Sequence, residues 1–345
     1  MAAVDTKFPV FQYNPNKFNF TVNDNNIDSE FDLLLKKKWE AAKNDNIFRY
    51  QLNITEWKRL AGKFEFLAQL SLDRARNRRT PENITSMNTP FDEKRFNFTK
   101  INSKEILFDV DCGDGNNIIA VNVSPIEYGH CLFLPERLKC LPQKVTEFSL
   151  LKIIELFLLS SSPYLRAIFN SLCAYASVNH LHWHLYYLKH KMLLENINLE
   201  CLVDPLYKLT NYPAKGFCFK LSSFPEFNIR ALVSSAFTFI NYLQKHEIAH
   251  NIYITRAKTE LLSINDNSYN DIRIYIWART STMGIKNTSR FSPAVSELFG
   301  HLMIKSEEAY KTLNEDQVIQ CFNDVTSAPF EQIVQAINSN DINIT

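Results

Sequence analysis

Three histidines at alternate positions in the middle of the chain could support chemistry by their type and spacing. His180, His182 and His184 are separated only by Leu181 and Trp183. Because successive side chains of a β-strand point to opposite faces, this spacing places the three imidazoles on one face and the apolar residues on the other. A group of imidazoles beside a core needs hydrogen-bond partners or a ligand. The pattern therefore predicts a binding or reactive site on a strand.

Three interpretations of this strand remain open from the spacing alone. Two histidines at alternate strand positions, with a third imidazole beside them, could bind a metal ion. One imidazole could instead attack phosphorus while its neighbours hold its tautomer and protonate the leaving group. The third interpretation is a hydrogen-bonded polar strand at an interface, with no ligand.

The residues that flank the histidines favour phosphorus. Ser177 and Asn179 directly precede the three histidines, and Asn170 lies upstream of a tight loop. These neutral donors suit the non-bridging oxygens of a phosphate and are poor ligands for a divalent metal. No acidic residue stands nearby to complete a hard-metal site, so we expect no metal site and no cofactor.

A scattered set of basic residues could balance phosphate charge at such a site. Arg74, Arg78 and Arg79 form a basic cluster after a short apolar run, and Lys100 follows further along the chain. A solvated charged face is the alternative explanation for each of them.

Composition excludes several classes of protein. The 345 residues are 46% hydrophobic, which predicts a packed globular protein. The net charge of +1 gives no overall electrostatic attraction to nucleic acid or to a membrane surface, so neither is expected as a partner. With seven glycines, the chain contains neither a G-x-G-x-x-G nor a P-loop pattern. Seven cysteines without a C-x-x-C pair, and an N-terminus without the apolar run of a signal peptide, predict a cytoplasmic setting.

The elements expected to position the histidines alternate between strands and helices. In both halves the order strand, helix, strand ends in a polar strand, which predicts a duplicated α+β architecture with antiparallel sheets and packed helices. An extended arm is expected over 1–27 and a connector over 190–213. Strands are predicted at 105–111, 117–123, 131–135, 164–170, 179–188, 215–222, 251–256 and 271–279, and helices at 28–45, 145–160, 229–246 and 292–310.

One further motif matches a metalloprotease signature letter for letter. His246-Glu-Ile-Ala-His250 reads H-E-x-x-H, which binds zinc only when both histidines lie on one helical face. The helical pattern ends as the motif begins, and a strand pattern follows it. We therefore interpret the match as a coincidence at a helix end.

The histidine segment resembles the histidine triad superfamily. His180-Leu-His182-Trp-His184-Leu-Tyr fits its H-φ-H-φ-H-φ-φ signature, with φ an apolar residue. More closely, the chain resembles the GDP-D-glucose phosphorylase family, whose plant relatives act as GDP-L-galactose phosphorylases. The segments that carry this resemblance are 47–52, 96–100, 122–130, 169–180, 251–256 and 297–301.

The resemblance implies a fold, a reaction and site residues. The fold would be histidine-triad-like, as in galactose-1-phosphate uridylyltransferase, with one such domain over 28–190 and a second over 191–345. His182 would attack the α-phosphorus of a GDP-hexose and form a guanylyl-histidine, from which inorganic phosphate would release GDP. His180 and His184 would orient His182 and manage protons. Substrate contacts are expected from Ser177, Asn179, Asn170, Lys100 and Asn122.

Alternatives within the resemblance are a GDP-L-galactose-type phosphorylase, a nucleotide hydrolase that uses water as acceptor, and a catalytically silent nucleotide-binding protein. The plant enzymes carry Gln where this chain has His184, which favours GDP-glucose. Relatives commonly have Gly at the position of Cys173 and Asn at that of Ser71. Arg256, Arg279 and Lys286 are weaker candidates for contact with substrate across a cleft between the halves.

Overall fold

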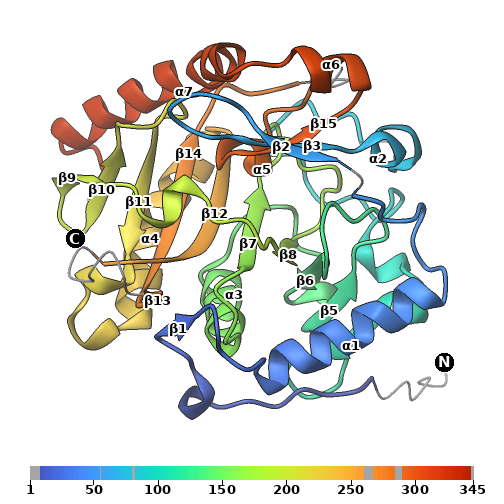
Figure 1. Ribbon diagram of the computed structural model, residues 1–345. Coiled ribbons are helices and arrows are strands. Elements are labelled where there is room, and N and C mark those ends of the chain that lie inside the picture. The colour runs from blue at the N-terminus through green and yellow to red at the C-terminus, as the bar shows by residue number, and fades with distance from the viewer. Residues whose placement is uncertain (1–7, 55, 80–81, 260–266, 284–289, 343–345) are drawn as a thin grey trace.

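An antiparallel sheet of ten strands runs through the molecule in the order β4-β5-β6-β8-β7-β12-β14-β11-β10-β9 (Figure 1). The computed structural model describes residues 8–54, 56–79, 82–259, 267–283 and 290–342. The sheet strands are β4 (Ile106–Asp109), β5 (Ile118–Val121), β6 (Cys131–Leu134), β7 (Leu165–Asn170), β8 (Trp183–Tyr187), β9 (Glu200–Val203), β10 (Leu206–Leu209), β11 (Gly216–Lys220), β12 (His250–Ala257) and β14 (Asp271–Ala278).

The order of strands shows that the chain consists of two related halves. In each half the five strands lie in the order first, second, third, fifth, fourth, and the two fourth strands, β7 and β12, pair at the centre. A helix connects the third and fourth strands in both halves. The expected boundary at residues 190 and 191 falls between β8 and β9.

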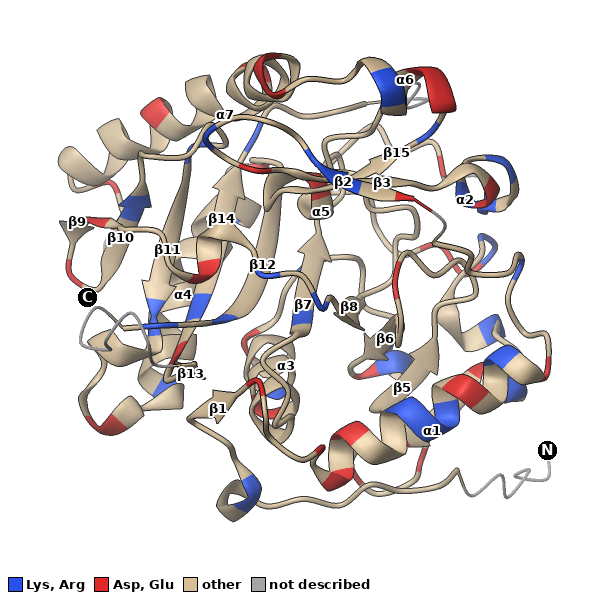
Figure 2. Cartoon of the chain, in the orientation of Figure 1, with Lys and Arg blue, Asp and Glu red and all other residues tan. Residues whose placement is uncertain are grey.

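Helices cover one face of the sheet. The apolar residues of α1 (Glu30–Asn44), α3 (Glu147–Leu159) and α4 (Ile229–Lys245) join alternate residues of the strands in the largest core cluster. Ser29 caps the start of α1, because its side chain accepts from the backbone N–H of Asp32. Basic and acidic residues are mixed along α1, in keeping with the small net charge (Figure 2).

A second layer covers the opposite face, to which His184 points. It contains a three-stranded sheet of order β15-β3-β2, in which β15 pairs with β3 in parallel. Its elements are β2 (Trp57–Arg59), β3 (Leu67–Leu70), α2 (Leu72–Asn77), α5 (Val295–Leu298), β15 (His301–Ile304) and α6 (Glu307–Thr312). A small separate pair is formed by β1 (Val22–Asn23) and β13 (Ser268–Tyr269).

The last helix, α7 (Glu315–Asn338), contributes side chains to the clusters on both faces. Pro329 lies inside it and cannot donate to the carbonyl of Val325. That carbonyl accepts from the backbone N–H of Thr280 instead, so the helix continues through the proline with its buried acceptor satisfied.

Several observed elements differ from the expected ones. The helix expected over 292–310 is wrong: Gly300, at φ +103°, ends a single turn, and β15 and α6 follow. The connector expected over 190–213 contains β9 and β10, and α7 was not expected at all. The histidine strand begins at Trp183, because the backbone N–H of His182 donates to the Gln143 side chain and not to a neighbouring strand.

Candidate active site

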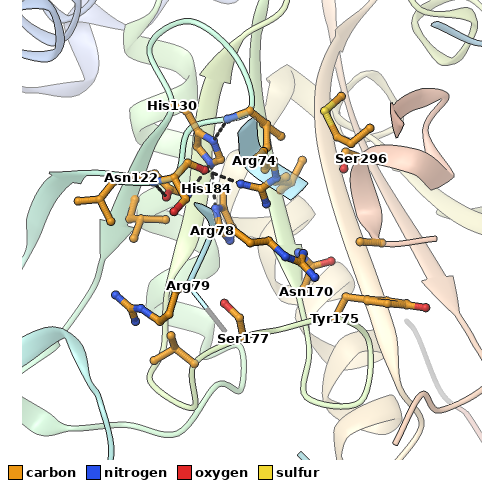
Figure 3. A pocket seen from close by; sticks show the side chains of 18 of the residues that line it. Arg74, Arg78, Arg79, Asn122, His130, Asn170, Tyr175, Ser177, His184 and Ser296 are labelled. Atoms are coloured by element: carbon orange, nitrogen blue, oxygen red, sulfur yellow. Dashed lines mark hydrogen bonds between the residues drawn. The ribbon is translucent and has the colours of Figure 1, made fainter. Parts of the chain in front are cut away.

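A pocket lies between the ten-stranded sheet and the second layer (Figure 3). Its floor consists of residues from β5, β6, β7 and β8, and its roof of residues from α2, α5 and β15. Of the residues singled out in the sequence, those that line it are Ser71, Arg74, Arg78, Arg79, Asn122, Asn170, Ser177, His182 and His184.

The geometry fixes the tautomer of His182. Its Nδ1 lies 2.7 Å from the backbone carbonyl of His180, so Nδ1 carries the proton and donates it. Nε2 is then the lone-pair nitrogen, and it has no protein partner in the described part of the chain. Burial lowers the pKa of His182 to about 4, which keeps the ring neutral and nucleophilic at pH 7.

Gln143 holds the backbone of this nucleophile. Its Oε1 accepts from the N–H of His182 at 2.9 Å, and its Nε2 donates to the carbonyls of His182 and Asn170 at 3.1 and 2.9 Å. One side chain therefore connects the backbone of His182 to the end of β7.

His184 is oriented by a second buried imidazole, His130. Nδ1 of His130 accepts from the backbone N–H of Ile126 at 3.0 Å, so its Nε2 carries the proton and donates to Nδ1 of His184, also at 3.0 Å. Nε2–H of His184 is consequently a donor, and it has no protein acceptor among the described residues. Burial lowers the pKa of both rings well below the ordinary value. Asn122 lies beside this pair, with Nδ2 at 3.1 Å from Nε2 of His130 (Figure 3).

His180, by contrast, is a buried structural residue that does not line the pocket. Its Nδ1 accepts from the backbone N–H of Phe98 and its Nε2 donates to the carbonyl of Arg137, both at 3.0 Å. The three histidines therefore have three different environments. Only two of them can meet a ligand.

Two of the residues expected to contact substrate lie outside the pocket. The amide of Asn179 donates to the carbonyls of Thr89 and Pro90, and its Oδ1 accepts from the N–H of Gln143. Lys100 is exposed and its Nζ donates to two loop carbonyls. Asn170, Ser177 and Asn122 do reach the pocket.

Three guanidinium groups enter the pocket from α2 and the segment after it. Arg74 donates to the carbonyl of Ser124, and Arg79 lies 3.3 Å from the ring centroid of Phe96. Within the described residues none of Arg74, Arg78 and Arg79 forms an ion pair with a carboxylate. Burial lowers the pKa of Arg78 and that of Arg79, the latter to about 10. Partly buried cations without carboxylate partners are suited to bind an anionic ligand.

The second half of the chain also contributes to the pocket, through residues that were not predicted from the sequence. Ser292, Ser296 and Lys305 come from α5 and the segments around β15. Nζ of Lys305 donates to Oγ of Ser292 at 2.8 Å, and burial, with Arg78 nearby, lowers the lysine pKa to about 8. Only the family resemblance points to the segment 297–301. Its pairing with β3 joins residues far apart in the chain, so no local sequence pattern predicts it.

The weaker candidates have other environments. Arg256 is buried and donates to the carbonyls of Phe157 and Ser160, and Arg279 donates to Oδ1 of Asn251. Lys286 lies outside the described residues. The H-E-x-x-H match is a helix end, as expected, since α4 stops at Lys245 and His250 begins β12.

Two features are absent from the described residues. No group of three or more His, Cys, Asp or Glu side chains there has an arrangement that could hold a metal ion. In the same residues, every helix is too short or too polar to cross a membrane.

A solved structure shares this fold. The yeast Ap4A phosphorylase Apa2 has the same fold: its structure matches 87% of this chain and 98% of its own, with a TM-score of 0.62 and 12% sequence identity. The predicted histidine-triad-like α+β fold is thereby confirmed.

The chain belongs to the GDPGP1-like family. The model of the GDPGP1-like N-terminal domain matches residues 30–186, and that of the C-terminal domain matches 192–340. GDP-D-glucose phosphorylase 1 of Danio rerio is 38% identical over 317 residues, which cover 90% of this chain and 91% of that protein. The Homo sapiens protein of that name is 36% identical over 87% of this chain and 80% of its own length. GDP-L-galactose phosphorylase 2 of Arabidopsis thaliana is 29% identical over 84% of this chain and 71% of its own.

Proposed function

We propose that this chain is a GDP-D-glucose phosphorylase that works through a guanylyl-His182 intermediate. The observation that carries the proposal is the neutral His182, whose unprotonated Nε2 faces a basic pocket in a member of this family. GDP-glucose and inorganic phosphate are the two substrates, and the cytoplasmic setting expected from the cysteine pattern is part of the proposal.

The first step is an in-line displacement at the α-phosphorus. Nε2 of His182 forms a bond to phosphorus, and the bond from phosphorus to the bridging oxygen breaks, so that glucose 1-phosphate leaves with the electron pair. Nε2–H of His184 donates to a non-bridging oxygen as negative charge develops there, while Arg74 and Arg78 balance the charge of the leaving phosphate.

In the second step an oxygen of inorganic phosphate attacks the same phosphorus. The bond to Nε2 breaks, the ring returns to its neutral form and GDP is released. Two in-line inversions give net retention at phosphorus. The carbonyl of His180 holds the proton on Nδ1 throughout and stabilises the ring while Nε2 is substituted.

Intact mass spectrometry tests the intermediate. The protein mixed briefly with GDP-glucose in the absence of phosphate is expected to gain the mass of one guanylyl group and to release glucose 1-phosphate. Added phosphate should remove this group as GDP much faster than water removes it as GMP. Equal rates would indicate a hydrolase, and the absence of an adduct at every time would contradict the mechanism. His246→Ala, at an exposed helix end, is the matched control.

The pKa of His182 leads to a second prediction, on the pH dependence of guanylylation. An imidazole becomes protonated, and stops being a nucleophile, as the pH falls through its pKa. His182, with a pKa of about 4, therefore stays unprotonated at pH 5.5. In single turnovers without phosphate, the rate constant should change less than about twofold between pH 7.5 and 5.5. An ordinary histidine pKa of about 6.5 would instead lower it about tenfold. Circular dichroism at both pH values controls for unfolding.

A further inference from the structure

The pocket has two chemically different ends on opposite sides of the reactive histidines. Figure 3 shows Asn122 and Arg79 on one side of His184, and Ser296 and Tyr175 on the other. The first end has apolar walls, and the second has hydroxyl, amide and amino groups. The apolar wall consists of Phe98, Ile101, Ala120, Leu132 and Val178.

This difference orients a nucleotide sugar, an argument that rests on the proposed function. With the α-phosphate at His182, the flat base belongs at the apolar end, because aromatic and aliphatic walls replace its hydration best. The hexose and its phosphate then lie at the polar end, near Lys305 and Ser296.

Two polar side chains line the pocket together with the apolar wall. Glu105 ends the short 3-10 helix Ser103–Glu105, where its Oε1 accepts from the backbone N–H of Asn102 at 3.0 Å. That bond fixes the carboxyl group, and no protein donor among the described residues reaches its Oε2. Arg79 is held over the ring of Phe96, and no ion pair joins it to Glu105.

The carboxylate acceptor of Glu105 and the guanidinium donor of Arg79 together match the hydrogen-bonding groups of guanine. Its N1–H and N2 amino group are adjacent donors that fit one carboxyl group, and its O6 and N7 are acceptors that fit one guanidinium group. Adenine places an acceptor at N1, which a carboxylate repels. We propose that Glu105 and Arg79 recognise guanine, Glu105 through N1–H and the N2 amino group and Arg79 through O6 and N7.

Nucleotide binding measured by calorimetry tests this assignment without requiring turnover. The wild-type protein is expected to bind GDP more tightly than ADP, and IDP, which lacks the N2 amino group, with intermediate affinity. Glu105→Gln should lower the ratio of GDP to ADP affinity by about 10- to 100-fold, because an amide offers one donor and one acceptor and therefore suits adenine. It should also remove the difference between GDP and IDP. Arg79→Gln should lower the GDP to ADP ratio as well.

The outcomes separate this inference from the proposed function. Equal losses of GDP and ADP affinity in Glu105→Gln would place the carboxyl group on the ribose and overturn the assignment. Equal losses in Arg79→Gln would place Arg79 on the phosphates and overturn its part. Glu93→Gln, an exposed carboxyl group away from the pocket, is the matched control. A protein that prefers GDP through Glu105 but forms no guanylyl adduct would contradict the proposed function alone.

Discussion

Replacing His182 by alanine is expected to lower kcat for phosphorolysis of GDP-glucose by about 10⁴-fold or more, the loss typical of removing a covalent nucleophile. The pocket itself should survive, since Gln143 holds residue 182 through its backbone N–H and carbonyl. GDP binding is therefore expected to stay within a few-fold of wild type. Steady-state release of glucose 1-phosphate and calorimetric GDP binding measure the two quantities. A variant that kept a hundredth of the wild-type kcat would rule out His182 as nucleophile.

His180→Ala is the informative comparison, because the same spacing pattern predicts both residues. The His180 ring satisfies the buried N–H of Phe98 and the carbonyl of Arg137, and leaving a buried polar group unpaired costs about 1–3 kcal/mol. We expect a loss of about 2–5 kcal/mol in the free energy of unfolding, measured with urea, and a kcat per folded molecule within about tenfold of wild type. A stable His180→Ala protein without activity would show that this ring takes part in the chemistry.

Local periodicity and family resemblance predict part of this site from the sequence. The alternation of histidines and apolar residues placed His182 and His184 on the pocket face, with Trp183 in the core on the other. It could not distinguish His180, whose environment depends on the carbonyl of Arg137 and the N–H of Phe98, which are 43 and 82 residues away in the chain. Spacing indicates a face, whereas the partner of each ring is a long-range property.

The roof of the pocket shows the same limit. Arg74 and Arg78 belong to a predicted basic cluster for which a solvated face is the favoured explanation from sequence alone, and only the position of α2 in the structure brings them to the pocket. Lys305 was not noticed, since β15 joins β3 across more than two hundred residues of sequence. Gly300 and the Asn314–Gln317 capping box are sequence signals for the end of α5 and the start of α7, and both argue against one helix over 292–310.

Replacing His184 by leucine is expected to lower the rate constant of guanylylation by about 10²- to 10³-fold, the usual effect of removing one donor to a developing negative charge. His184→Gln should recover most of that loss, to within about tenfold of wild type, because its amide also presents an N–H. Single-turnover formation of the guanylyl adduct measures both variants. Equal rates for the leucine and glutamine variants would show that the donor at this position does not act on the transition state.

His130 provides a sharper test of the same donor, because its Nε2 lies 3.0 Å from Nδ1 of His184 and sets the tautomer of that ring. In His130→Leu, Nδ1 of His184 loses its donor. The proton of His184 can then move from Nε2 to Nδ1, which leaves Nε2 with a lone pair that faces the phosphate oxygens. We expect a loss of about 10²-fold in the rate constant of guanylylation. In a His184→Leu background the same substitution should cost less than about fivefold, since leucine presents no donor for His130 to orient. Equal losses in the two backgrounds would mean that His130 does not act through the donor at position 184.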